Sequence, residues 1–89
     1  PIVLVEDRPH SNSWIRPGLM ADHMKRWKAH DRIFKKLKKD GIKDIYYIKG
    51  KSLFGDDNEG SPDASHPTDL GFMRQAEIMY PVLRKLCRK

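Results

Sequence analysis

The chain opens with an unbroken apolar run, Ile2-Val3-Leu4-Val5, and this run limits the possible folds more than any other feature. A strand that is apolar at every position, rather than at every second one, is typical of a parallel sheet covered on both faces. Parallel strands need a crossover connection, which is usually a helix. We therefore predict an α/β fold with a first strand at residues 1–6. Because such a strand needs neighbours on both sides, we expect the chain to be a piece of a larger protein.

The rest of the sequence supplies the other elements of such a fold. Apolar residues recur at helical spacing in two long segments. Asp40-Gly41 closes the first segment, Thr68 is the expected N-cap of the second, and Pro81 predicts a kink or a restart within it. The expected elements are helix 18–39, strand 44–49, loop 50–67 and helix 68–88. Strand, helix and strand together predict a right-handed parallel βαβ unit.

The charge of the chain leaves open a function that involves no catalysis. Eighteen Lys and Arg residues against twelve Asp and Glu residues give a formal net charge of +6 at pH 7. A basic, non-catalytic α/β module that binds nucleic acid or another polyanion is therefore the alternative interpretation. The basic residues of helix 18–39, however, surround an apolar stripe and have no aromatic residues among them for base stacking. We favour a solvated face and expect no specific nucleic-acid partner.

Three further classes of protein are disfavoured by the sequence. No apolar run approaches the roughly 18 residues of a membrane-spanning helix, so we predict no membrane span. Cys87 is the only cysteine, which excludes an internal disulfide framework and a zinc site with several cysteines. His23 and His30 lie seven residues apart on the first helix without a third ligand, so we expect no metal site there.

Loop 50–67 is the region where we expect chemistry. It begins at the carboxyl end of a strand, where open α/β sheets place their sites, and it is long for a compact domain. Near its end, Asp63 precedes His66 by three residues. A carboxylate at this spacing can accept the imidazole Nδ1–H and fix the tautomer of the ring. The same residues also fit a polar loop with Thr68 and Asp69 at a helix start, so spacing alone leaves both interpretations open.

The segment Asp63-Ala-Ser-His-Pro-Thr-Asp-Leu-Gly-Phe72 resembles the last conserved block of the SGNH hydrolases, also called GDSL esterases. The usual form of that block is Asp-Gly-x-His-Pro-Thr-Asp, and Ala64 departs from it. Residues 1–8, Trp14, the long helix and Ile45–Ile48 also look like the C-terminal half of this family. The resemblance therefore covers nearly the whole chain.

This resemblance implies that residues 1–89 are the C-terminal βαβα portion of one three-layer α/β/α domain with parallel strands, a flavodoxin-like arrangement. It implies that Asp63 and His66 are catalytic, as two members of a Ser-His-Asp triad that hydrolyses acyl esters. Carbohydrate acetyl esters are one substrate class within the family. The resemblance implies neither a metal nor an organic cofactor.

The third member of the implied triad is absent from the sequence. The family's serine lies in a Gly-Asp-Ser block, which this chain lacks, and its serines lie in loops without that context: Ser11, Ser13, Ser52, Ser61 and Ser65. We expect the N-terminal half of the same hydrolase domain to supply the serine and the oxyanion donors. Without a nucleophile there is no route to an acyl-enzyme, so we predict that this chain alone is inactive.

The residues around the proposed pair carry further expectations. Glu6, Asp7 and Arg8 end the first strand and could face the site, but we favour a charged strand end that faces water. His10, in the next loop, is expected at the surface rather than in the chemistry.

Two expectations concern geometry. Leu53 and Phe54 interrupt the polar loop, and we expect them to pin it to the body of the protein, with a pocket wall as the alternative. The Asp63 carboxylate should lie about 2.6–3.2 Å from His66 Nδ1. His66 Nε2 should point away from the core of this chain, toward the space that the rest of the domain would occupy.

Overall fold

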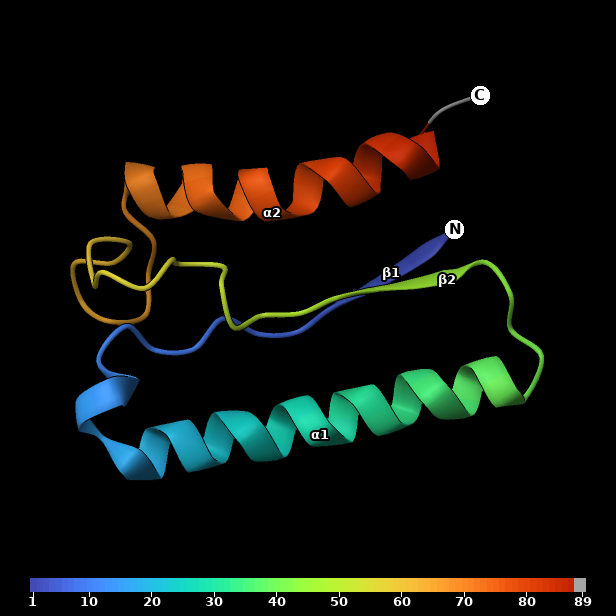
Figure 1. Cartoon of the computed structure of the whole chain (residues 1–89), viewed down its shortest axis with the longest axis horizontal. Coiled ribbons are helices and arrows are strands. Elements are labelled where there is room, and N and C mark those ends of the chain that lie inside the picture. The colour runs from blue at the N-terminus through green and yellow to red at the C-terminus, as the bar shows by residue number, and fades with distance from the viewer. Residues whose placement is uncertain (88–89) are drawn as a thin grey trace.

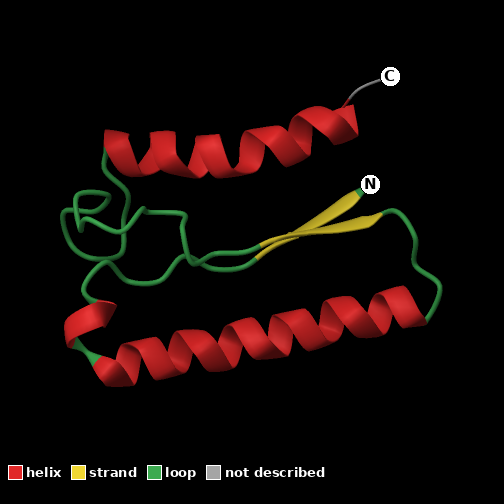
Figure 2. Cartoon of the chain, viewed as in Figure 1, coloured by secondary structure: helices red, strands yellow, loops and turns green. Residues whose placement is uncertain are grey.

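The computed structural model describes residues 1–87 as two parallel strands and two long helices (Figure 2). The elements are β1 (Ile2–Val5), the short 3-10 helix η1 (Ser13–Ile15), α1 (Pro17–Lys39), β2 (Ile45–Ile48) and α2 (Asp69–Cys87). β1 and β2 pair in parallel, with Ile2 opposite Ile45 and Val5 opposite Ile48. The α/β class and the parallel βαβ unit predicted from the sequence are confirmed.

The helix ends follow from local chemistry. Proline has no N–H to lose in the first turn, and α1 begins at Pro17, one residue before the expected start. Gly41 adopts a φ of +97°, which suits glycine, and its N–H reaches the carbonyl of Lys38 at 3.1 Å, so the expected end of α1 is confirmed. α2 runs unbroken through Pro81, so the restart we considered does not occur. Its expected last residue, Arg88, lies outside the described residues.

The sheet lies between the two helices, with α1 on one face and α2 on the other (Figure 1). Side chains of β2 contact both helices. The ring of Tyr47 lies 5.0 Å from that of Phe34 on α1, centroid to centroid. Tyr46 lines a hollow with Pro81 and Leu86 of α2, and Tyr47 also borders it. The result is three layers, helix, sheet and helix.

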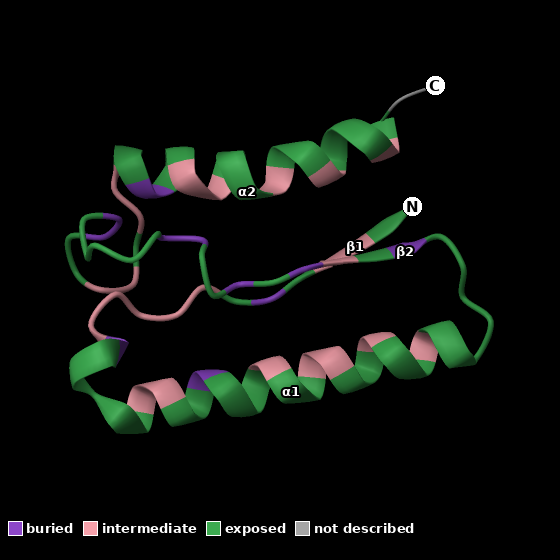
Figure 3. Cartoon of the chain, in the orientation of Figure 1, coloured by how far each residue is buried: buried purple, intermediate pink, exposed green. Residues whose placement is uncertain are grey.

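The buried apolar core is small and lies near β2 and the loop that follows it (Figure 3). Its members are Ile45, Ile48, Leu53 and Phe54, each at most 4% exposed. Leu53 and Phe54 therefore do pin the long loop to the body, as predicted. β1 has only β2 as a neighbour within residues 1–87, and Ile2 is 58% exposed.

The predicted apolar stripe of α1 needs correction. The apolar residues at helical spacing in this segment, which predict a buried stripe, are Met20, Met24, Trp27, Ile33, Phe34 and Leu37. Met24 and Ile33 are 47% and 55% exposed, while His23, at 1%, is the buried residue of this helix. A histidine can be buried there because its ring stacks on Trp27 and its Nε2 accepts the backbone N–H of His10 at 3.0 Å.

The outer surface of α1 is basic and exposed. The side chains of Lys25, Arg26, Lys28, Arg32, Lys35, Lys36, Lys38 and Lys39 are all exposed. Lys35 pairs with Asp31 one turn earlier at 2.8 Å. Neither helix in residues 1–87 combines the length and the apolar character needed to cross a membrane.

Candidate active site

The ends of the two strands are joined by a buried carboxylate. Glu6 is 7% exposed, and it accepts the hydroxyl of Tyr47 and the backbone N–H of Gly50, the latter at 2.9 Å. Burial, and then the hydrogen bond to Glu6, raise the pKa of Tyr47 above its ordinary value. The expectation that Glu6 faces water is therefore wrong, because Tyr47 and Gly50 come from the neighbouring strand and its exit.

Arg74 of α2 holds the first part of the loop. Its guanidinium donates to the carbonyl of Phe54 at 2.8 Å and to both carboxylate oxygens of Asp57 at 2.6 Å. This paired hydrogen bond, with the backbone N–H of Glu59, holds the pKa of Asp57 well below its ordinary value. The loop is thus held to the helix that follows it by a bidentate ion pair.

Thr68 fixes the place where the loop becomes α2. Its hydroxyl accepts the N–H of Gly71 at 3.1 Å and donates to the carbonyl of Glu59 at 3.1 Å, which confirms it as the N-cap. Gly71 lies so close to the loop that a Cβ on it would come within 2.1 Å of the carbonyl oxygen of Gly60. The loop therefore packs directly on the first turn of α2.

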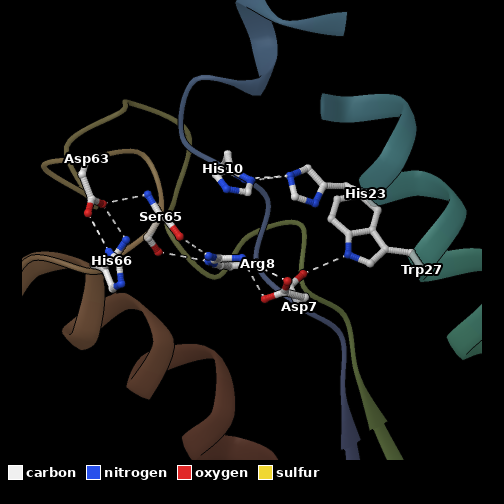
Figure 4. A network of polar contacts seen from close by, with 8 residues as sticks. All are labelled: Asp7, Arg8, His10, His23, Trp27, Asp63, Ser65 and His66. Carbon is white, nitrogen blue, oxygen red and sulfur yellow. Dashed lines mark hydrogen bonds and ion pairs between the residues drawn. The ribbon is translucent and has the colours of Figure 1, made fainter. Parts of the chain in front are cut away.

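Between these anchors, Asp63 and His66 contact each other (Figure 4). Asp63 Oδ2 lies 2.6 Å from His66 Nδ1, which confirms the predicted distance. Asp63 Oδ1 accepts the backbone N–H groups of His66 at 2.7 Å and Ser65 at 3.0 Å, and the hydroxyl of Ser61 at 3.2 Å. Ala64, with a φ of +73°, makes the reversal that brings the two side chains together.

The electrostatics of the pair favour a charged carboxylate. The backbone N–H groups of His66 and Ser65 hold the pKa of Asp63 well below its ordinary value, and the His66 ring adds to this. An ionised Asp63 can only accept, so Nδ1 of His66 carries the proton and Nε2 of the neutral ring is left with a lone pair. The His66 side chain is 81% exposed, so this lone pair is available to accept a proton from outside residues 1–87.

The segment after β1 is more involved than the sequence indicated. Arg8 reaches the loop, where its Nε donates to the carbonyl of Ser65 at 3.1 Å. The Asp7 carbonyl accepts the indole N–H of Trp27 at 2.9 Å. His10 is partly buried and its Nδ1 lies 2.9 Å from Nε2 of His23. The water-facing interpretation is wrong for Arg8, and His10 is bound to a helix residue rather than free at the surface.

A hollow of about 380 Å³ lies beside this segment. Its lining includes the exposed ring of Trp14, together with polar side chains such as His10, Lys51, Asp56 and Asn58. Ser11, also on its lining, donates its backbone N–H to the carbonyl of Ala64 at 3.0 Å. A residue that lines the hollow is therefore hydrogen-bonded to the Asp63–His66 turn. Within residues 1–87, no three His, Cys, Asp or Glu side chains gather as they would around a metal ion.

The fold and the site together define an α/β protein with a carboxylate–histidine pair beyond the carboxyl end of its parallel strands. A sequence model of the GDSL-like lipase/acylhydrolase family matches residues 1–84. The chain therefore belongs to this family, which confirms the resemblance seen in residues 63–72.

The same relationship appears among solved structures. The chain matches the crystal structure of a protein described as a "putative GDSL-like lipase" from Bacteroides ovatus, with 27% sequence identity and a TM-score of 0.90. The match covers 97% of this chain and 26% of that one, so the chain spans about a quarter of the length of its structural relative. No curated protein matches the chain significantly.

Proposed function

We propose that this chain supplies the histidine and the carboxylate of a serine ester hydrolase. The observation that carries the proposal is the 2.6 Å contact between Asp63 Oδ2 and His66 Nδ1, on a ring that is otherwise exposed. One ring nitrogen is held, and the other is free to exchange a proton. That division of roles is what a catalytic histidine requires.

In this mechanism His66 Nε2 first acts as a general base. It removes the proton from a serine hydroxyl as that oxygen attacks the ester carbonyl, and Asp63 stabilises the imidazolium that forms. The imidazolium then donates the proton to the leaving alcohol. In the second half, His66 removes a proton from the water that attacks the acyl-enzyme, and returns it to the serine oxygen as the acyl–oxygen bond breaks. Asp63 stays ionised throughout, consistent with its lowered pKa.

The serine and the oxyanion donors are assigned to another part of the same domain. The chain contains no Gly-Asp-Ser sequence, and its serines near the pair have structural partners. Ser61 donates to Asp63, while the hydroxyl of Ser65 accepts from Arg8. The partner of this chain in catalysis is therefore the N-terminal half of its own hydrolase domain.

The hollow beside residues 9–14, which a Ser11–Ala64 hydrogen bond links to the turn of the pair, supports an ester with a hydroxylated alcohol portion, such as an acetylated carbohydrate. The 69% exposed ring of Trp14 offers an apolar face, while Lys51, Asp56 and Asn58 offer hydrogen-bond donors and acceptors. Small-molecule sites commonly combine an aromatic surface with a few polar groups in this way. We therefore propose an acyl ester, and not a nucleic acid, as the ligand of this surface.

The test is the steady-state hydrolysis of a small chromogenic acetyl ester by the full-length protein that contains this chain. Asp63→Asn should lower kcat by about 10⁴-fold, because it removes the charge that holds the tautomer. His66→Ala should lower kcat by about 10⁶-fold, because it removes the general base. Thermal unfolding should show that both variants remain folded, since neither side chain belongs to the buried core of residues 1–87. Near-wild-type turnover in either variant would contradict the proposal.

Matched controls come from α1. His30 packs on Tyr47, and Asp31 pairs with Lys35, so neither touches the proposed pair. His30→Ala and Asp31→Asn should keep kcat within about threefold of the parent value, as expected for substitutions away from the chemistry. A loss in these controls equal to the loss in the site variants would show that the assay reports folding instead of catalysis.

A further inference from the structure

Arg8 lies between the end of β1 and the Asp63–His66 turn. Its Nε donates to the carbonyl oxygen of Ser65 at 3.1 Å, and its Nη2 donates to the Ser65 hydroxyl. The remaining nitrogen, Nη1, lies 3.0 Å from both carboxylate oxygens of Asp7. The side chain of Arg8 is only 20% exposed. The guanidinium thus binds Asp7 on one side and Ser65 of the loop on the other (Figure 4).

The peptide group that Arg8 grips is the one that carries His66. The carbonyl of Ser65 and the N–H of His66 belong to one planar group and point in opposite directions across it. Arg8 binds the carbonyl end at 3.1 Å, while Asp63 Oδ1 binds the N–H end at 2.7 Å. Two bonds on opposite ends of a plane stop it from rotating. Rotation of that plane would swing the N–H of His66 away from Asp63 Oδ1, and so loosen the carboxylate that holds the imidazole.

The segment that carries Arg8 is itself fixed to α1. The indole N–H of Trp27 binds the carbonyl of Asp7 at 2.9 Å, and Nε2 of the buried His23 accepts the N–H of His10 at 3.0 Å. A nitrogen that accepts a backbone N–H carries no proton, and burial, followed by the nearby His10, lowers the pKa of His23 in agreement with this. The backbone on either side of Arg8 is therefore hydrogen-bonded to α1.

We propose that Arg8 is a positioning residue that sets the direction of the His66 imidazole by clamping the Ser65–His66 peptide. The inference rests on the proposed function, because it assigns a role toward a histidine whose catalysis is itself proposed. Arg8 does not line the hollow beside the loop. Its three nitrogens bind Ser65 and Asp7, so we expect its effect on the chemical step and not on substrate binding.

The experiment uses the full-length protein and the same chromogenic ester. A misplacement of about 1 Å costs about 100-fold in rate, so Arg8→Ala should lower kcat by about 100-fold while KM changes by less than about threefold. Arg8→Lys keeps the charge but lacks the planar fork, and it should lose about tenfold. Ser65→Ala keeps the gripped carbonyl and should lose less than Arg8→Ala. Arg32→Ala, on the exposed face of α1, is the matched control and should leave kcat unchanged.

Chemical rescue separates positioning from general destabilisation. Millimolar methylguanidinium should restore kcat at least fivefold in Arg8→Ala, because it can occupy the vacated space and grip Ser65 again, and it should leave Arg32→Ala unaffected. An unchanged kcat in Arg8→Ala would overturn the inference. So would a loss that matches the unfolded fraction from thermal melting and is not rescued. If His66→Ala is inactive while Arg8→Ala is active, only this inference fails; if His66→Ala is active, the proposed function fails.

Discussion

Ala64 offers a sharp test of the backbone geometry at the site. Its φ of +73° is a left-handed conformation, which costs an L-residue with a Cβ about 1–2 kcal/mol and costs glycine almost nothing. The change to test is Ala64→Gly in the full-length protein. It relieves that strain in the folded state, but it also gives the unfolded chain extra freedom.

The two effects differ in size, so the sign can be predicted. The added freedom of glycine in the unfolded chain is about 0.5–1 kcal/mol, which leaves a net increase in the free energy of unfolding of about 0–1.5 kcal/mol. Urea denaturation measures this quantity directly. Turnover should be kept, because the bonds from Asp63 to His66 and Ser65 use backbone and side-chain atoms that residue 64 does not provide.

The matched control is Ala29→Gly in the middle of α1. Here the backbone is helical and the side chain is exposed, so glycine should lower the free energy of unfolding by about 1 kcal/mol. The same chemical change is thus expected to have opposite signs at the two positions. If Ala64→Gly destabilises the protein as much as Ala29→Gly does, the left-handed turn at Ala64 is refuted.

Two other predictions concern the anchors of the loop. Gly71→Ala would place a Cβ 2.1 Å from the carbonyl oxygen of Gly60, and it should destabilise the full-length protein by about 1–3 kcal/mol in thermal melts. The control Gly18→Ala meets open space and should not destabilise it. Equal effects of the two substitutions would contradict the close packing at Gly71. Asp57 has a folded-state pKa below its ordinary 3.8, so its stabilising effect is complete above pH 3.8 and is lost as the pH falls through the lower folded value. Arg74→Met removes the first cause of that shift, so the fall in unfolding free energy between pH 4 and pH 2 should become shallower than in the parent, and an unchanged slope would refute it.

Local patterns account for what the sequence predicted correctly. The apolar run Ile2–Val5 predicted a parallel strand, because apolar side chains at every position are typical of a strand that is covered on both faces. Thr68 predicted the start of α2, because its hydroxyl accepts a backbone N–H three residues later. The three-residue spacing of Asp63 and His66 predicted their contact, because side chains this close in sequence can meet within one turn of chain. Each of these depends on neighbours close in the chain.

Contacts between distant residues account for what the sequence did not predict. Arg8 and Ser65 are 57 positions apart, and Tyr47 and Glu6 are 41 apart, so nothing in the local pattern announces either pair. The burial of His23 depends in the same way on the backbone of His10. The available signal was the position of residues 6–8 at the carboxyl end of a strand, where α/β sheets collect functional groups.

The Asp63–His66 pair is confined to a single turn of chain, and this affects how the site assembles. The entropy lost on closing a loop grows with the number of residues enclosed, so a contact across three positions is among the least costly a chain can form. Contacts of this kind also form early, whereas distant ones wait for the rest of the fold. The carboxylate and the imidazole can therefore find each other independently of the remaining domain. Contacts between distant residues, such as Arg8 with Ser65, form only in the folded protein. In our proposal they set the direction of the His66 imidazole.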